Sequence, residues 1–352
     1  MGFVTNLGAM LCATDLELPQ IDHFIAQFMN WLYGLIGNYG WTVVVFTLIL
    51  KLVLSPLDIW QKLSMHKNNR AMKRMKPQIE KLQKQYAHDK QMFQQKQLQL
   101  YKQEGYSMFG SCLPMIVTIV VFFIVFAGFN SMATYRVKMD YYEIATVYET
   151  TVDEMVADES TDYEIDSPEV IAAAEQAVLD YYSEHRHQWL WIKNVFVGDN
   201  WSSIFPSYEE FTNQGLGGLG VGRDWVGELE DSYHKYTDVI RNHPDYQGWN
   251  GYLIMPVLTV LVTLASQLLM RQMTPPTVDS NSASATNQNA VMKFMMPAMM
   301  GFFALFYSSA FTIYLLVSQL FSTIFSLVFN MITDRMDKKE EEYILTHTFK
   351  RK

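Results

Sequence analysis

Five apolar segments limit what this chain can fold into more than any other feature of its sequence. They cover residues 39–57, 109–129, 252–270, 294–307 and 311–332. A bilayer core about 30 Å thick needs roughly 20 apolar residues of helix, and lipid offers no hydrogen-bond partners to an exposed backbone. The sequence therefore predicts an all-α integral membrane protein with five transmembrane helices. The last two segments are separated only by Ser308 and Ser309, which predicts a tight helical hairpin with a short first arm.

The charged residues predict how these helices are oriented. Residues 58–105 hold eleven Lys and Arg against four Asp and Glu, whereas residues 131–250 hold seven against twenty-three. Lys and Arg accumulate on the cytoplasmic side of membrane proteins. We therefore expect the 58–105 segment, the 271–293 loop and the 333–352 tail inside, and residues 1–38 and 131–250 outside. This N-out, C-in arrangement separates Cys12 from Cys112, so both are expected to be free thiols.

The N-terminal segment contains apolar residues at helical spacing before the first span. They are Ile21, Phe24, Ile25, Phe28, Leu32, Leu35 and Ile36. This pattern predicts a short helix lying on the outer membrane interface. An extension of the first span is the alternative.

The basic segment 58–105 is expected to form a cytoplasmic helical hairpin. Its first arm carries an apolar seam of Met65, Met72, Met75, Ile79, Leu82 and Tyr86. Asp89 is a candidate cap for a second helix that runs to Glu104. Two interpretations of the basic surface are open: it binds anionic lipid, ribosomal RNA or a nascent chain, or it is a solvated face that follows the positive-inside rule.

Lys51 is a cation inside the first apolar segment. Such a charge is costly in lipid, so it is expected to face protein, water or a bound anion. The five segments contain no Asp or Glu, and their polar residues include Thr47, Thr118, Thr259, Thr263, Gln267, Tyr314, Ser318 and Gln319. These residues are candidates for the lining of a hydrated groove that attracts a transient anion. The alternatives are that Lys51 extends to the cytoplasmic surface and that the polar residues only join helices.

Methionines recur along one face of the fourth segment. They are Met292, Met295, Met296, Met299 and Met300, of which the last four are candidates for an adaptable apolar slide. Flexible thioether side chains can pack against varied apolar partners, although ordinary core packing explains the same pattern.

The sequence as a whole resembles the YidC family of membrane protein insertases, which are relatives of the mitochondrial and chloroplast oxidase-assembly and Albino insertases. The matching stretches are Gly37–Trp41, Phe46–Lys51, Ser55–Leu57, Met75–Tyr86, Leu100–Gly105, Gly110–Pro114, Leu190–Asn194, Leu253–Pro256, Met292–Pro297 and Phe311–Gln319. The resemblance implies a five-helix core with a hydrophilic groove open to the cytoplasm and to lipid. Lys51 stands where the family carries its groove arginine, so the positive charge is kept but the bidentate fork is lost.

The chain departs from five-span relatives mainly outside the membrane, where residues are added on both sides of Leu190–Asn194. Pro168 is expected to start an amphipathic helix there, with Ala172, Ala173, Val178 and Tyr182 on its apolar face. The role of this 131–250 domain is left open.

The resemblance implies that the protein inserts newly made membrane proteins into a bacterial plasma membrane, as a multi-pass protein and not as an enzyme. Its expected partners are nascent membrane proteins and the lipid bilayer, with the ribosome and the general secretion channel as candidates; DNA is not expected. No cofactor, catalytic group or metal site is indicated, because Gly215–Gly220 lacks a preceding strand and the pair His185 and His187 lacks further ligands. The rival functions are a small-anion transporter or channel and a structural scaffold.

Overall fold

The computed structural model describes residues 17–104, 108–157, 163–201, 203–213, 218–221, 230–273, 295 and 297–349. In these ranges the regular elements are helices, and β-pairing is limited to two isolated bridges, Trp189 with Ile192 and Gly198 with Ser308. The predicted all-α class is confirmed. Within the described residues, three helices are long and apolar enough to cross a membrane, namely Tyr39–Gln85, Ile116–Val156 and Ser309–Lys339. Shorter apolar helices cover Phe24–Ile36, Ile254–Leu269 and Pro297–Phe306.

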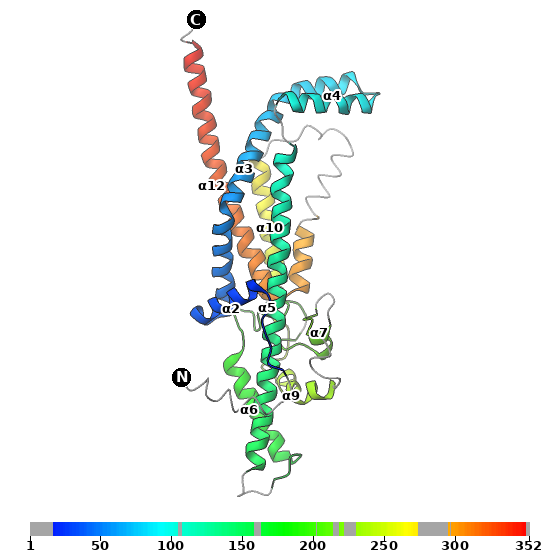
Figure 1. Ribbon diagram of the computed structural model, residues 1–352, viewed down its shortest axis with the longest axis vertical. Coiled ribbons are helices and arrows are strands. Elements are labelled where there is room, and N and C mark those ends of the chain that lie inside the picture. The colour runs from blue at the N-terminus through cyan, green and yellow to red at the C-terminus, as the bar shows by residue number, and fades with distance from the viewer. Residues whose placement is uncertain are drawn as a thin grey trace. The chain divides into compact units, whose positions relative to one another are not determined.

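The long helices continue past the ends of the apolar segments. The helix α3 covers Tyr39–Gln85, α5 covers Met108–Val156 and α12 covers Ser309–Phe349, whereas α10 covers only Ile254–Met273. The segment ends expected at residues 57, 129 and 332 therefore lie inside continuous helices (Figure 1). A helix satisfies its own backbone hydrogen bonds in lipid and in water alike, so a change of environment does not require it to stop.

By compactness the chain divides into two units, and the long helices contribute to both. The first unit contains residues up to Phe46, Ile124–Thr259 and Gly301–Tyr314. The second contains Thr47–Phe123, Val260–Met300 and Leu315–Lys352.

In the first unit, the N-terminal helix α2 covers Phe24–Ile36 and is separate from α3. Gly37 ends it in the left-handed conformation, with φ of 76°, a geometry that glycine adopts without strain. The expected short helix is therefore present, and the alternative of an extended first span is excluded. Ile25, Met29 and Leu32 are buried, whereas Phe24 and Leu35 are 65% and 68% exposed.

An aromatic core joins the residues added outside the predicted spans. The helices α6, Pro168–His185, α7, Tyr208–Thr212, and α9, Glu230–Asn242, pack along the second half of α5 (Figure 1). The ring of Tyr233 on α9 lies 5.4 Å from Tyr141 on α5 and 5.0 Å from Phe211 on α7, measured between centroids. Both additions therefore contribute to one folded domain.

The predicted start of α6 is confirmed, because Ser167 is its N-cap and Pro168 its first residue. Val178 and Tyr182 are buried as expected. The expectation for Ala172 and Ala173 is wrong, since Ala172 is exposed and Ala173 only half-buried. The buried small residue is Ala174, which lies one turn before Val178 and shares its face.

A short irregular stretch, residues 194–199, ties this domain to the first residues of α12 and to Asn250 before α10. The backbone N–H groups of Ser309 and Ala310 donate to the carbonyls of Val197 and Val195, at 2.9 and 2.7 Å. The amide of Asn250 donates to the carbonyl of Asn194 at 2.7 Å. These bonds satisfy backbone groups that would otherwise be left bare at the helix ends.

In the second unit, the end of α3 and α4, Lys90–Gln103, form the expected hairpin (Figure 1). Asp89 caps α4 by accepting a hydrogen bond from the N–H of Met92, as predicted. Met75, Ile79 and Leu100 are buried between the two arms. Met65, by contrast, is 45% exposed and lies outside this cluster.

Candidate substrate site around Lys51

Lys51 lies in the apolar part of α3 and contacts another apolar helix of the same unit. Its ammonium group donates a hydrogen bond to the hydroxyl of Ser322 on α12, with an Nζ–Oγ distance of 3.0 Å. The bond is partly buried. A hydroxyl supplies only a dipole, so this geometry leaves the lysine charge without neutralisation by the group that it touches.

Hydroxyl groups continue along the same face of α12. Ser318, Ser322 and Ser326 follow one another at four-residue steps, and therefore lie above one another on the helix. Ser326 is buried, donates to the carbonyl of Ser322 at 2.6 Å and is also bonded by the ammonium of Lys62. The result is a polar row along an otherwise apolar helix.

Helix α10 adds further polar groups in this unit. Ser266 is buried and shares a 2.7 Å hydrogen bond with the hydroxyl of Thr323 on α12. Thr263 is also buried, and Gln267 is half-buried. Polar contacts of this kind join helices in membranes, and they also line paths for polar groups.

The structure separates the sequence-derived candidates into different environments. Thr47 is fully buried one turn before Lys51, Ser318 and Gln319 are half-buried on α12, and Thr118 on α5 is exposed. Tyr314 belongs to the first unit, where its ring lies 5.3 Å from that of Phe129. Thr259 is buried in the same unit.

Sequence reasoning missed the groups that contact the lysines directly. Ser322 and Ser326 extend the row of Ser318 by one and two turns, and that spacing was visible in the sequence. The 3.6-residue period would have identified them once Ser318 was considered.

Among the methionines, Met295 and Met299 are 58% and 45% exposed. Met300 is half-buried. Met292 and Met296 lie outside the described residues. Met295 and Met299 thus present flexible apolar surface, and Met299 does so from the helix Pro297–Phe306.

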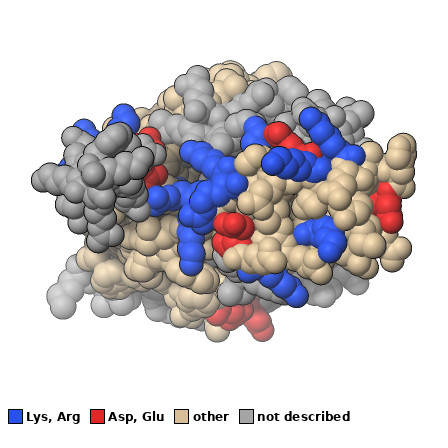
Figure 2. All heavy atoms as spheres, turned by 90° about the horizontal axis from the view of Figure 1, so that it is seen from above, with Lys and Arg blue, Asp and Glu red and all other residues tan. Residues whose placement is uncertain are grey.

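The second unit has a basic surface near the hairpin. Figure 2 shows the molecule from above, with more Lys and Arg than Asp and Glu in view. Arg70 on α3 lies 3.4 Å from the carboxylate of Asp337 on α12, and Arg74 lies 3.7 Å from that of Glu104. Exposed pairs like these contribute little to stability, so their main effect is on the local potential.

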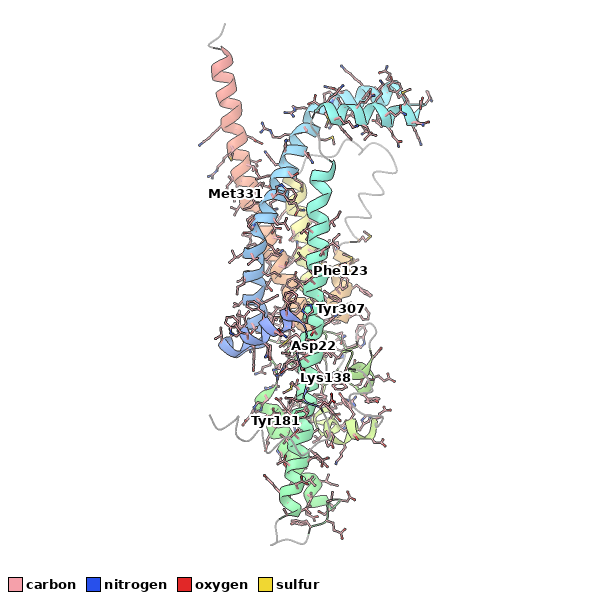
Figure 3. All side chains as sticks on the ribbon, viewed as in Figure 1. Asp22, Phe123, Lys138, Tyr181, Tyr307 and Met331 are labelled. Carbon is pink, nitrogen blue, oxygen red and sulfur yellow. The ribbon has the colours of Figure 1, made fainter. Side chains whose placement is uncertain are left out.

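A buried charged cluster in the first unit was not predicted. The Asp140 carboxylate lies 3.0 Å from Nε2 of His187 and 3.4 Å from the Arg136 guanidinium, and all three side chains are largely buried. Figure 3 marks this region by Lys138 on α5 and Tyr181 on α6. Burial and the nearby Glu143 carboxylate raise the pKa of the Tyr181 phenol. Arg136 and Asp140 are four residues apart on α5, but His187 comes from a distant segment, so its place in the cluster was not visible in the sequence.

Within the described ranges, no three His, Cys, Asp or Glu side chains are placed to hold a metal ion. His187, considered above as one of a possible pair of ligands, instead bonds Asp140. The segment of Gly215 and Gly217 lies outside the described residues.

The chain also matches the model of a known protein family. The family model of the 60Kd inner membrane protein matches residues 31–339. The chain belongs to this family. Membership and the several apolar helices make it a multi-pass protein of the bacterial inner membrane. The resemblance to YidC proteins is thereby confirmed.

Three proteins similar to this chain, all named membrane protein insertase YidC, illustrate the similarity. The protein of Fusobacterium nucleatum is 32% identical over 111 residues, which are 32% of this chain and 52% of the relative. Those of Bordetella pertussis and Helicobacter pylori are 40% and 36% identical over 94 and 98 residues, or 27% and 28% of this chain. These matches cover 16% and 17% of the two relatives. The aligned stretches thus cover about half of one relative and about a sixth of the other two.

Proposed function

We propose that this protein inserts newly made membrane proteins into the bacterial plasma membrane, without covalent chemistry. The observation that carries the proposal is Lys51, a cation in an apolar helix whose contact is the neutral hydroxyl of Ser322. Family membership and the names of the relatives, which are membrane protein insertases, support the same activity.

The proposed topology has five spans, N-out and C-in, with the boundaries predicted from the sequence. The charge distribution supports it: the basic residues 58–105 connect the first two apolar segments, and the acidic residues 131–250 connect the second and third. The exposed rings of Phe24, Phe28 and Trp31 on α2 support an interfacial position for that helix.

In the proposed mechanism, Lys51 exchanges its bond to Ser322 for a bond to an acidic residue of the client. In the bond to Ser322 only the donor is charged, whereas a client carboxylate brings an opposite charge to the acceptor as well, which favours the exchange. Thr47, Gln267, Ser318 and Gln319 then replace part of the hydration that the client's polar tail loses. Thr118 completes the proposed groove. An unpaired polar group in hydrocarbon costs several kcal/mol, so each such contact lowers the barrier to crossing.

The apolar part of the client is proposed to slide past Met295, Met296, Met299 and Met300 into lipid. The hairpin formed by α3 and α4 receives the nascent segment on the cytoplasmic side, next to the ribosome or the general secretion channel. The driving force is the burial of the client's apolar helix, to which the membrane potential adds when the client is charged.

The test compares Lys51→Ala with Lys51→Arg in cells depleted of the native protein. A single-span client with acidic residues in its outer tail is followed by protease protection. We expect Arg to preserve insertion and Ala to reduce it about tenfold, since a charged hydrogen bond contributes at least ~1.5 kcal/mol. A client with amides in place of its acids should be insensitive to the Ala substitution.

Lys62→Ala is the matched control. Lys62 also bonds a serine of α12, but it lies eleven residues further along α3, or about 16 Å. It should leave insertion of the acidic client nearly unchanged. Equal loss in both alanine variants, or normal insertion with Lys51→Ala, would refute the charge-capture step. Normal insertion on depletion together with failed uptake of a small anion would favour a transporter instead.

A further inference from the structure

A two-residue turn exposes two large apolar side chains beside the ends of two apolar helices. Trp189 and Ile192 form the base of this turn and exchange two backbone hydrogen bonds, each 2.9 Å long. Both base residues are buried, whereas Leu190 is 64% and Trp191 37% exposed at the tip. The turn therefore has a fixed base and a projecting apolar tip.

The backbone of the tip is not relaxed. Leu190 has φ of 51°, in the left-handed region that residues with a Cβ rarely adopt. A leucine there is poorly suited to the turn and gains little from burial within the domain. Strain of this kind at an exposed position is a reason to look for a contact outside the chain.

The turn is held at the start of α3. The side-chain amide of Asn38 donates to the carbonyl of Gln188 at 3.1 Å. The ring of Trp189 packs edge-on against that of Trp41, with 5.7 Å between centroids, and directly over Gly40. Trp41 itself is 51% exposed.

The other side of the turn is held at the residues before α10. The N–H of Lys193 donates to the carbonyl of Asn250 at 3.1 Å, and its ammonium lies 5.8 Å from the centre of the Tyr252 ring. Tyr252 is 56% and Trp249 45% exposed. Exposed aromatic rings thus flank the tip on both sides, together with one cation.

We propose that the Leu190–Trp191 turn inserts into the outer leaflet of the lipid bilayer and anchors the 131–250 domain there. Trp and Tyr concentrate where membrane helices leave the hydrocarbon, because their rings have an apolar body and a polar edge. Trp41 stands at such a position in the first turn of α3 and Tyr252 just before α10, and Lys193 is placed to meet a lipid phosphate. The chemistry of this belt fits lipid better than a soluble partner, which would need more hydrogen-bonding groups.

The inference rests on α3 and α10 crossing the membrane and not on the insertase activity. Its failure is therefore distinguishable from failure of the Lys51 experiment, which measures client insertion.

The test places a fluorescent label on Leu190→Cys in the full chain with Cys12→Ser and Cys112→Ser. The protein is reconstituted in vesicles of phosphatidylethanolamine and phosphatidylglycerol. Quenching by lipids with a nitroxide near the headgroup is compared with quenching by aqueous iodide. The matched control is Ile165→Cys, which is 62% exposed on the same domain but separated from the turn by the 18 residues of α6, or about 27 Å.

We expect lipid nitroxide to quench the label at 190 at least threefold more than at 165, and iodide to show the opposite order. Equal quenching of both positions by iodide would place the tip in water and overturn the proposal. Protection from both quenchers would show that protein covers the tip, which also overturns it. If Leu190→Cys fails to fold, Trp191→Cys gives the same test from the second tip residue.

Discussion

Replacing Asp199 by alanine should loosen the beginning of α10. The carboxylate of Asp199 is fully buried and accepts the backbone N–H groups of Leu253 and Met255, at 2.7 and 2.8 Å. Alanine leaves both donors without this partner. A buried donor left unsatisfied costs about 1–3 kcal/mol, so the loss is about 2–6 kcal/mol for the two.

The amide variant Asp199→Asn is the matched control, because it keeps one acceptor oxygen at nearly the same volume. We expect it to lose about half as much as alanine. An amide does not titrate, so this variant should also lose the part of the pH dependence of unfolding that comes from Asp199. Burial raises the pKa of the Asp199 carboxyl despite its two backbone hydrogen bonds. A folded-state pKa above the unfolded value of about 3.9 means that the native protein binds this proton more tightly. The contribution of Asp199 to stability is therefore greatest at low pH and falls as the pH rises through the folded-state pKa.

Hydrogen exchange of the purified protein, followed by mass spectrometry, measures this effect locally. At the lower bound of 2 kcal/mol, amides in the first turn of α10 should exchange about 30-fold faster in Asp199→Ala, because 1.4 kcal/mol corresponds to a factor of ten. Peptides from α9 serve as the internal reference. If exchange at residues 253–256 changes by less than threefold, the carboxylate does not hold this helix end and the reasoning is wrong.

Two further substitutions test packing and charge in the first unit. Gly40→Ala should lower the free energy of unfolding by about 1–3 kcal/mol, because the added Cβ would lie 2.0 Å from Cγ of Trp189. The control Gly34→Ala has open space inside α2 and should be stabilising by up to about 1 kcal/mol, since alanine is the better helix former. Arg136→Ala should lower the free energy of unfolding by about 3–5 kcal/mol, because it leaves the Asp140 carboxylate buried without the positive charge of Arg136. Limited proteolysis of the 131–250 domain should then be faster. Unchanged melting with Gly40→Ala, or unchanged proteolysis with Arg136→Ala, would contradict these assignments.

Local patterns predicted several elements correctly. Ser167 and Pro168 marked the start of α6, and Asp89 marked the start of α4, because capping depends on residues within one turn of a helix end. The face of α6 was less well predicted, since three alanines in succession give no periodic signal and only packing selected Ala174.

The apolar segments and the block distribution of charge determined, from the sequence alone, that this is a helical membrane protein, since transfer into lipid depends on each segment's own composition. The same information singled out Lys51, which is costly wherever its helix lies in lipid. Only the tertiary structure decided that Ser322 is its contact, that Asp140, Arg136 and His187 meet, and that Leu190 and Trp191 project beside Trp41 and Tyr252. Except for Arg136 and Asp140, which are four residues apart on α5, these contacts join residues tens to hundreds of positions apart, and which distant side chains meet depends on how whole helices pack.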